Sequence, residues 1–433
     1  MSFRVDRRQF LMGSSALLAA GAMSPAAFAQ AAALRLYWWG GQTRADRTLA
    51  VADLFAKARG IPAPGGEFGS FQDYWPKLAT MVAGGNAPDV YQMDYRFIVE
   101  YATRGVIEPL DGFVESGILK LDDFDQDQIE GGKVGGKLYG ISLGANSVAA
   151  LYNQVAFDEA GTAPPALGWS FEDVPAIGEA FLAANIRGGY KAFADGSYNE
   201  PNLDNWIRQR GKELYTAEGK LGPDVDDMVD WFRMWNDFRT KGYIVAAEDQ
   251  ALDVDTPETS MLALNKAAFM WSNSNQLVVH QSVNPDKLGM TNYPRIAAGV
   301  GGGHYRKPSQ FWSMAATSAS KDLNADFISY FVNDLEAGKI LGVERGVPCS
   351  SAVREAVAPT LDEQSQVALN FVANLGDLIG PLPASPPNAA GEIDQSLLEV
   401  VGEEVSFGAR TPEDAAKFFV EEATAILARA KAA

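Results

Sequence analysis

The chain has 433 residues, of which 47% are hydrophobic, and a formal net charge of −19 at pH 7. This length favours two domains over one, and the acidity excludes a nucleic acid as partner, because Lys and Arg bind the phosphates. The single cysteine excludes an internal disulfide. The two histidines lie outside any metal-ligand spacing, so we expect no metal, no cofactor and no Ser-His-Asp triad.

Residues 1–29 have the features of a twin-arginine export signal. The pair Arg7–Arg8 precedes the apolar run 11–23, and Ala27–Ala29 is a small-x-small cleavage signal. The run is too short to span a bilayer, and no cysteine follows the cleavage site that could carry a lipid. We therefore expect a soluble periplasmic protein without membrane insertion. Asp6 stands where these signals usually carry Ser or Thr, so the Tat and Sec routes both stay open.

The N-terminal third of the chain after the signal alternates strand and helix patterns. Residues 34–39 alternate as a β-strand does, and Gly40 ends the run. Helical spacing follows over 49–60 and 74–83, and 88–94 is a short buried-strand candidate. This order predicts an α/β fold with crossover helices.

Residues 133–141 predict a β-hairpin with a two-glycine turn. Residues 131–137 also nearly match the phosphate-binding pattern GxxxxGK. Leu138 replaces the required Ser or Thr and no helix follows, so the hairpin is the better interpretation.

The rest of the chain is richer in helix. Trp231, Trp235 and Phe238 repeat on one helical face, which is typical of core packing. The proline-rich residues 381–387 predict an extended connector. Thr411-Pro412 begins the last helix, with a cap residue followed by proline.

Seven short segments then occur in a characteristic order and spacing: Tyr37–Gly41, Ala83–Val90, Arg104–Leu110, Gly136–Ile141, Leu151–Asn153, Phe311–Met314 and Gly346–Pro348. In these segments the chain resembles the family 1 extracellular solute-binding proteins of ABC importers, which include carbohydrate receptors similar to maltose-binding protein. The resemblance covers nearly all of the chain after the signal.

The resemblance implies an α/β, two-lobed periplasmic-binding-protein type II fold with three crossover segments and the ligand in the interlobe cleft. It also implies a small-molecule solute and a membrane permease as partners, and we expect a monomer. The crossovers should lie near 144–146, 311–312 and 346–348. The N-lobe would comprise 34–144 plus 312–346, and the C-lobe 147–309 plus 350–433.

A sugar offers flat apolar faces and a rim of hydroxyls, so its site needs aromatic platforms and polar side chains. Strand alternation makes Trp39 rather than Trp38 the exposed tryptophan. Trp271 and Asn273 are the strongest single candidates, because an apolar strand there enters a Ser/Asn cluster. The full set of candidate ligand-binding residues is Trp39, Gly40, Gln42, Thr43, Arg44, Asp94, Tyr95, Asn146, Trp206, Trp271, Asn273, Gly302, Trp312 and Arg345.

Several of these residues have a structural interpretation as well. Trp206 suits core packing, and Asp94 suits a helix cap. Arg44 can be a solvated charge at a helix start, and Arg345 can brace the hinge. Gly302 can belong to a simple loop.

The sequence thus predicts the binding component of an ABC importer, not an enzyme, with a mono- or oligosaccharide as ligand. A receptor for a polyamine, peptide or organic acid is the first alternative. Acidic residues in the cleft would favour a cation, and Arg44 or Arg345 there would favour an anion. The second alternative is a glycosidase, which needs two carboxylates roughly 5–9 Å apart across a cleft.

Overall fold

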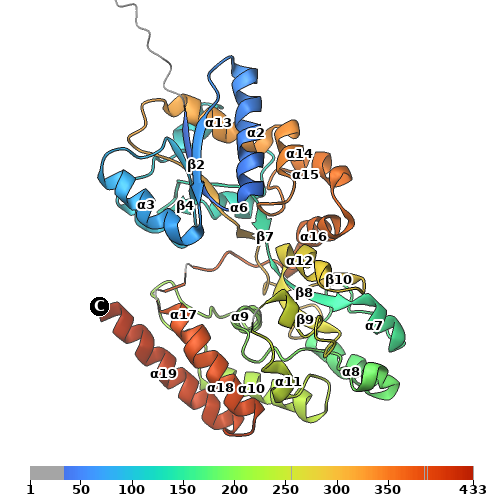
Figure 1. The fold of residues 1–433 in the computed structure, drawn as a ribbon. Coiled ribbons are helices and arrows are strands. Elements are labelled where there is room, and N and C mark those ends of the chain that lie inside the picture. Colours follow the sequence, from blue (N-terminus) through green and yellow to red (C-terminus); the bar gives the residue numbers. More distant parts are fainter. Residues whose placement is uncertain (1–33, 255, 385, 388, 433) are drawn as a thin grey trace, which may run out of the picture.

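The computed structural model describes residues 34–254, 256–384, 386–387 and 389–432. The predicted export signal at 1–29 lies outside the described residues. Figure 1 shows two lobes, with the chain passing between them at the level of β7. No helix in the described ranges is long and apolar enough to cross a membrane.

The first lobe is built on a five-stranded sheet in the order β2-β1-β3-β12-β6. β1 is parallel to β2 and β3, whereas β12 is antiparallel to β3 and β6. The predicted α/β fold and its first strand are confirmed. The strands are β1 (Arg35–Trp39), β2 (Gly65–Gly69), β3 (Val90–Met93), β6 (Ile141–Ser142) and β12 (Phe311–Met314).

Helices cover both faces of this sheet. Trp38 packs into one cluster with Phe55 and Phe327, and Trp39 packs on the opposite face with Tyr74. The prediction that Trp39 is exposed is therefore wrong, since α3 covers its face. The helices of this lobe are α2 (Gln42–Arg59), α3 (Phe71–Ala83), α4 (Ile98–Thr103), α5 (Asp111–Glu115), α6 (Gln126–Glu130), α13 (Lys321–Asn333), α14 (Leu335–Leu341) and α15 (Ser351–Val357).

The predicted hairpin is present. β4 (Lys133–Val134) pairs with β5 (Lys137–Leu138) in antiparallel register. Its turn residues Gly135 and Gly136 have φ of 58° and 80°, which suits glycine in a two-residue hairpin turn. The phosphate-loop alternative is therefore wrong.

The second lobe packs many helices around a three-stranded sheet in the order β10-β8-β9. Trp231, Trp235 and Phe238 lie in its core, as their spacing predicts. Its elements are β8 (Val148–Asn153), β9 (Phe269–Asn273), β10 (Leu288–Thr291), α7 (Gln154–Glu159), α8 (Val174–Ala184), α9 (Glu200–Gln209), α10 (Val225–Thr240), α11 (Ala247–Gln250), α12 (Leu277–Ser282), α16 (Glu363–Ala373), α17 (Ala390–Glu392), the π-helix η7 (Ile393–Leu398), α18 (Glu399–Ser406) and α19 (Pro412–Ala432).

Three segments of the chain run side by side between the lobes. β7 (Ala145–Asn146) pairs antiparallel with β11 (Lys307–Pro308), and Ala145 also bridges to Val347. The second joining segment is β11, which lies just before the predicted position near 311–312. Residues 311–312 belong to β12 instead and are fully buried between β3 and β6.

The third segment leads into α15, which packs against α14 of the first lobe. Ser350 and the backbone N–H of Ala352 donate hydrogen bonds of 2.6 Å and 2.8 Å to Asp123. The chain therefore joins the second lobe only at α16, later than the predicted 350 (Figure 1).

Candidate ligand site at the lobe junction

Aromatic side chains gather where β1 and α3 meet. The Trp39 ring makes edge contacts with Phe71 and Tyr74, at centroid distances of 5.4 Å and 5.1 Å. Trp75 lies 5.6 Å from Trp39 and 4.1 Å from Phe97. Trp39 is only 8% exposed, so the partly exposed Phe71, Trp75 and Phe97 form the outer part of this aromatic cluster.

The end of β3 supplies two further candidates. The Asp94 carboxylate accepts hydrogen bonds of 2.9 Å from the backbone N–H and from Nε of Arg96. The predicted alternative, a helix cap, is wrong, because α4 begins at Ile98 with Phe97 at its N-cap and the Asp94 carboxylate bonds Arg96 instead. The Tyr95 hydroxyl donates a 2.7 Å hydrogen bond to the carbonyl of Pro383 in the connector.

The two candidate arginines are engaged within the protein. Arg44 Nε pairs with Glu344 at 2.8 Å, and its Nη1 donates to the carbonyl of Trp39 at 3.0 Å. Arg345 is 4% exposed and donates to Thr48 Oγ1 at 2.8 Å. Burial, and then the proximity of Arg44, lower the pKa of Arg345 to about 9. Both arginines are therefore engaged by residues of the first lobe.

Three candidate tryptophans lie in the hydrophobic cores. Trp312 is fully buried, and Trp206 is 4% exposed with its ring tilted by 57° against that of Trp231 at a centroid distance of 5.5 Å. Trp271 is 8% exposed, and its indole N–H donates to the carbonyl of Ala194 at 3.2 Å. All three rings pack against other side chains in the hydrophobic clusters of the two lobes. Strand-end position alone does not reveal such packing, because helices of the lobe cover the rings.

The remaining candidates are scattered. Asn273 is exposed at the end of β9, and Asn146 lies in β7 between the lobes. Gly302 has φ of +82°, and its N–H donates to the carbonyl of Leu378 at 3.1 Å. On α2, Gln42 Nε2 donates to Asp46 at 2.7 Å. Thr43 and Gly40 stand at the start of the same helix.

Residues near the junction that the sequence did not single out lie on α9 and beside β11. Glu200 and Asp204 are one helical turn apart on α9. Burial first, and then the charge of Asp204, raise the pKa of Glu200 to about 8. Burial likewise raises the pKa of Asp204 to about 6. The i, i+4 spacing of these two acids is visible in the sequence, but the same spacing is typical of a solvent-exposed helix face and does not by itself indicate a site.

Tyr305 connects these acids with the first lobe. Its hydroxyl interacts electrostatically with Asp204, Glu200 and Tyr95. Arg208, one turn beyond Asp204, lies over the Tyr305 ring at 5.0 Å. Tyr305 therefore packs against Arg208 of α9, and burial first, then the charges of Asp204 and Glu200 on the same helix, raise the pKa of its hydroxyl.

The connector after Ile379 touches both lobes. Arg208 of α9 donates to the carbonyl of Pro381, and Tyr95 of the first lobe donates to that of Pro383. In Figure 1 this segment passes between the lobes on its way to α17. It therefore borders the region around Tyr305.

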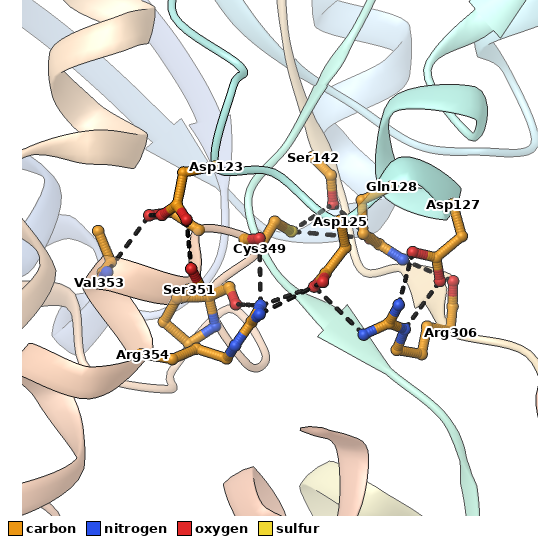
Figure 2. A network of polar contacts seen from close by, with 12 residues as sticks. Asp123, Asp125, Asp127, Gln128, Ser142, Arg306, Cys349, Ser351, Val353 and Arg354 are labelled. Atoms are coloured by element: carbon orange, nitrogen blue, oxygen red, sulfur yellow. Dashed lines mark hydrogen bonds and ion pairs between the residues drawn. The ribbon is translucent and has the colours of Figure 1, made fainter. Parts of the chain in front are cut away.

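A separate network of hydrogen bonds and ion pairs joins the hinge segments to α6 (Figure 2). Arg306 pairs with Asp127 at 2.8 Å and with Asp125 at 3.2 Å. Arg354 pairs with Asp125 from the other side at 2.6 Å. This network ties the segments before β11 and after Val347 to α6.

Cys349 lies inside this hinge network. It is 3% exposed, and its Sγ lies 3.3 Å from Ser142 Oγ. Burial raises the pKa of the thiol to about 12, so at neutral pH it is protonated. A buried and protonated thiol is a poor nucleophile.

Two α/β lobes joined by three adjacent segments define the class of two-lobed periplasmic-type binding proteins. A sequence model of the family described as bacterial extracellular solute-binding protein matches residues 50–364, and the chain belongs to this family.

Solved structures agree with this assignment. A family 1 extracellular solute-binding protein from Alicyclobacillus acidocaldarius is 30% identical, with a TM-score of 0.82, over 91% of this chain and 98% of that one. An oligogalacturonide-binding protein from Yersinia enterocolitica has a TM-score of 0.76 over 92% of this chain and 99% of that one. At 21% identity, that second likeness shows the fold alone.

A curated relative is matched only locally. A putative binding protein of Brucella abortus (strain 2308) is 30% identical over 93 residues, which is 22% of this chain and 22% of that protein. The chain is thus aligned with about a fifth of the length of this relative.

Proposed function

We propose that this chain is the receptor of an ABC importer, which binds a carbohydrate between its lobes and delivers it to a membrane permease. One observation carries the proposal: Tyr95 of the first lobe and Arg208 of the second both donate to the connector after Ile379, and Arg208 lies over the Tyr305 ring beside it. Aromatic rings suit the faces of a sugar, and carboxylates suit its hydroxyl rim. The export signal predicted at 1–29 would place this receptor in the periplasm.

Binding would proceed by lobe closure, without chemistry. A ligand that contacts both lobes favours the closed state by the difference between its affinities for the two states. The three joining segments form the natural hinge, since β7 and β11 are only two residues long and pair with each other. A micromolar receptor needs about −8 kcal/mol of binding free energy.

The test is a thermal-shift panel on the mature chain, which is the protein without the predicted signal at 1–29. The panel contains neutral sugars, amino sugars, sugar acids, amino acids and polyamines. A ligand at a hundred times its dissociation constant adds about 2.7 kcal/mol of stability. We expect a carbohydrate to raise the melting temperature. If only amino acids or polyamines raise it, the carbohydrate assignment is wrong.

The glycosidase alternative is tested on the same samples. The sugar that raises the melting temperature is incubated with the protein and then analysed by chromatography. We expect the sugar to remain intact, and hydrolysis would replace the receptor assignment by an enzymatic one.

A further inference from the structure

The carboxylates of Glu200 and Asp204 lie on α9 without an ion pair in the described part of the chain. Both side chains are partly buried on α9, and neither forms an ion pair with a residue that the structure describes. Lys307 on β11 is the weakest influence on the pKa of Glu200, and Arg208 lowers the pKa of Asp204 by less than burial raises it. Carboxylates held away from water without a counter-ion are unfavourable, so this pair is a candidate site for a positive charge.

Tyr215 provides a second, independent sign of a missing ligand. Its side chain is 6% exposed, and its hydroxyl has no hydrogen-bond partner among the described residues. Burial raises the pKa of this hydroxyl, and the charges of Glu200, Asp394 and Asp204 raise it further. A buried hydroxyl without a partner is unfavourable, and a ligand atom at this position would satisfy it.

The surrounding charges favour a cation over an anion. Arg208 is engaged with the carbonyl oxygens of Gly303 and Pro381. Lys307 is exposed, so its charge is screened by solvent. The titratable groups that act on the acid pair come from five segments of the chain: Glu200, Asp204 and Arg208 of α9, Glu213 and Tyr215 after it, Tyr293 after β10, Tyr305 and Lys307 near the hinge, and Asp394 of η7.

We propose that the ligand is a carbohydrate carrying a protonated amine, and that Glu200, Asp204 and the Tyr215 hydroxyl bind its ammonium group. An ammonium has three N–H donors, which these three acceptors match in number. The proposal rests on the proposed function and narrows its ligand class. A neutral sugar would leave both carboxylates without compensating charge.

The same groups give the binding a pH dependence. Glu200, with its pKa raised to about 8, is protonated at neutral pH in the free protein. An ammonium stabilises the carboxylate, so binding releases that proton and becomes tighter as pH rises from about 5.5 to about 7. A neutral sugar bound by the protonated acid would show no such gain.

The experiment is isothermal titration of the mature chain with glucosamine oligosaccharides, their N-acetylated counterparts and neutral malto-oligosaccharides. We expect the free-amine sugars to bind at least about tenfold more tightly than the other two. Glu200→Gln or Asp204→Asn should each weaken amine binding by about tenfold or more, and Tyr215→Phe should weaken it by a few-fold. Glu213→Gln is the matched control, an exposed acid beside Asp204, and should change the affinity by less than about twofold.

The outcomes separate this inference from the proposed function. If N-acetylated or neutral oligosaccharides bind as tightly as the amine and Glu200→Gln has no effect, the inference is overturned and the carbohydrate receptor stands. If a polyamine binds and no sugar does, both carbohydrate assignments fail. The melting temperature of each variant is measured first, and Tyr215→Phe decides the question if an acid variant does not fold.

Discussion

Two polar clusters near the lobe junction use their charges in opposite ways. In the hinge network, Asp125 and Asp127 are both paired with Arg306, and Asp125 also pairs with Arg354. On α9, Glu200 and Asp204 have no ion pair within the described part of the chain. Charges that are satisfied within the protein hold structure, whereas charges left unpaired at a junction are available to a ligand.

The two clusters also differ in what their pKa values indicate. The pKa of Glu200 is raised to about 8, because burial and like charges act on it together. Asp123, beside the hinge network, has a lowered pKa, because hydrogen bonds from Ser350 and Ser351 outweigh its burial. We therefore expect substitutions in the hinge network to change stability and substitutions on α9 to change binding.

The largest effect should come from neither cluster but from the core beside the hinge. Trp312→Ala removes a fully buried ring that packs against Phe327 and Phe331. We expect a loss of about 3–5 kcal/mol in the free energy of unfolding, measured by urea denaturation. A loss below about 1 kcal/mol, together with lost sugar binding, would instead make Trp312 a ligand platform.

Breaking the hinge network should have the next largest effect. Arg306→Ala leaves Asp125 and Asp127 with less counter-charge at side-chain exposures of 18% and 21%. We expect a loss of about 2–3 kcal/mol by the same denaturation measurement.

The matched control for Arg306 is Arg104→Ala. Arg104 forms an exposed pair with Glu100, at 61% and 55% side-chain exposure. This variant should lose less than about 0.5 kcal/mol. Equal losses in the free energy of unfolding for both variants would show that the hinge network stabilises the protein no more than a surface ion pair does.

Neutralising Glu200 should change stability in the opposite direction. A carboxyl whose pKa is raised on folding destabilises the protein as pH rises from its unfolded pKa towards its folded pKa, because the folded state keeps a proton that the unfolded state has released. The window is therefore from about pH 4.5 to about pH 8.

We expect Glu200→Gln to match the wild type near about pH 4 and to be more stable by about 1–2 kcal/mol near about pH 8, once its partial exposure is allowed for. Melting temperatures across this range measure the difference. A variant less stable than the wild type at high pH would show that Glu200 has an internal cationic partner.

The smallest effect concerns Cys349. Its thiol is buried and its pKa is raised to about 12, so a thiol reagent at about pH 8 should not react with the native chain. Reaction should become complete after unfolding in guanidinium. Rapid labelling of the native chain would mean that the hinge network opens readily.

The sequence predicted what depends on local pattern. The last helix begins where Thr411-Pro412 indicates, and the Asp414 N–H donates to Thr411 Oγ1 at 3.1 Å. The two-glycine hairpin and the core stripe of Trp231 and Trp235 are equally local. Propensity and periodicity are properties of neighbouring residues, so these features need no tertiary information.

The candidate site was much harder to predict. Whether Trp271 or Trp312 faces a ligand depends on which helices cover each strand, and the covering residues are distant in sequence. The pairing of Arg44 with Glu344 joins residues three hundred positions apart. Glu200 and Asp204 stand out only once their missing counter-ion and the neighbouring Tyr215 are visible.

The most direct test of a receptor that closes on its ligand is small-angle X-ray scattering of the mature chain, with and without saturating glucosamine oligosaccharides. We predict a smaller radius of gyration with the sugar for the wild type, and the same decrease for Glu200→Gln only at about tenfold higher sugar concentrations. Binding of the sugar to the wild type without any change in the radius of gyration would contradict a ligand site between the lobes.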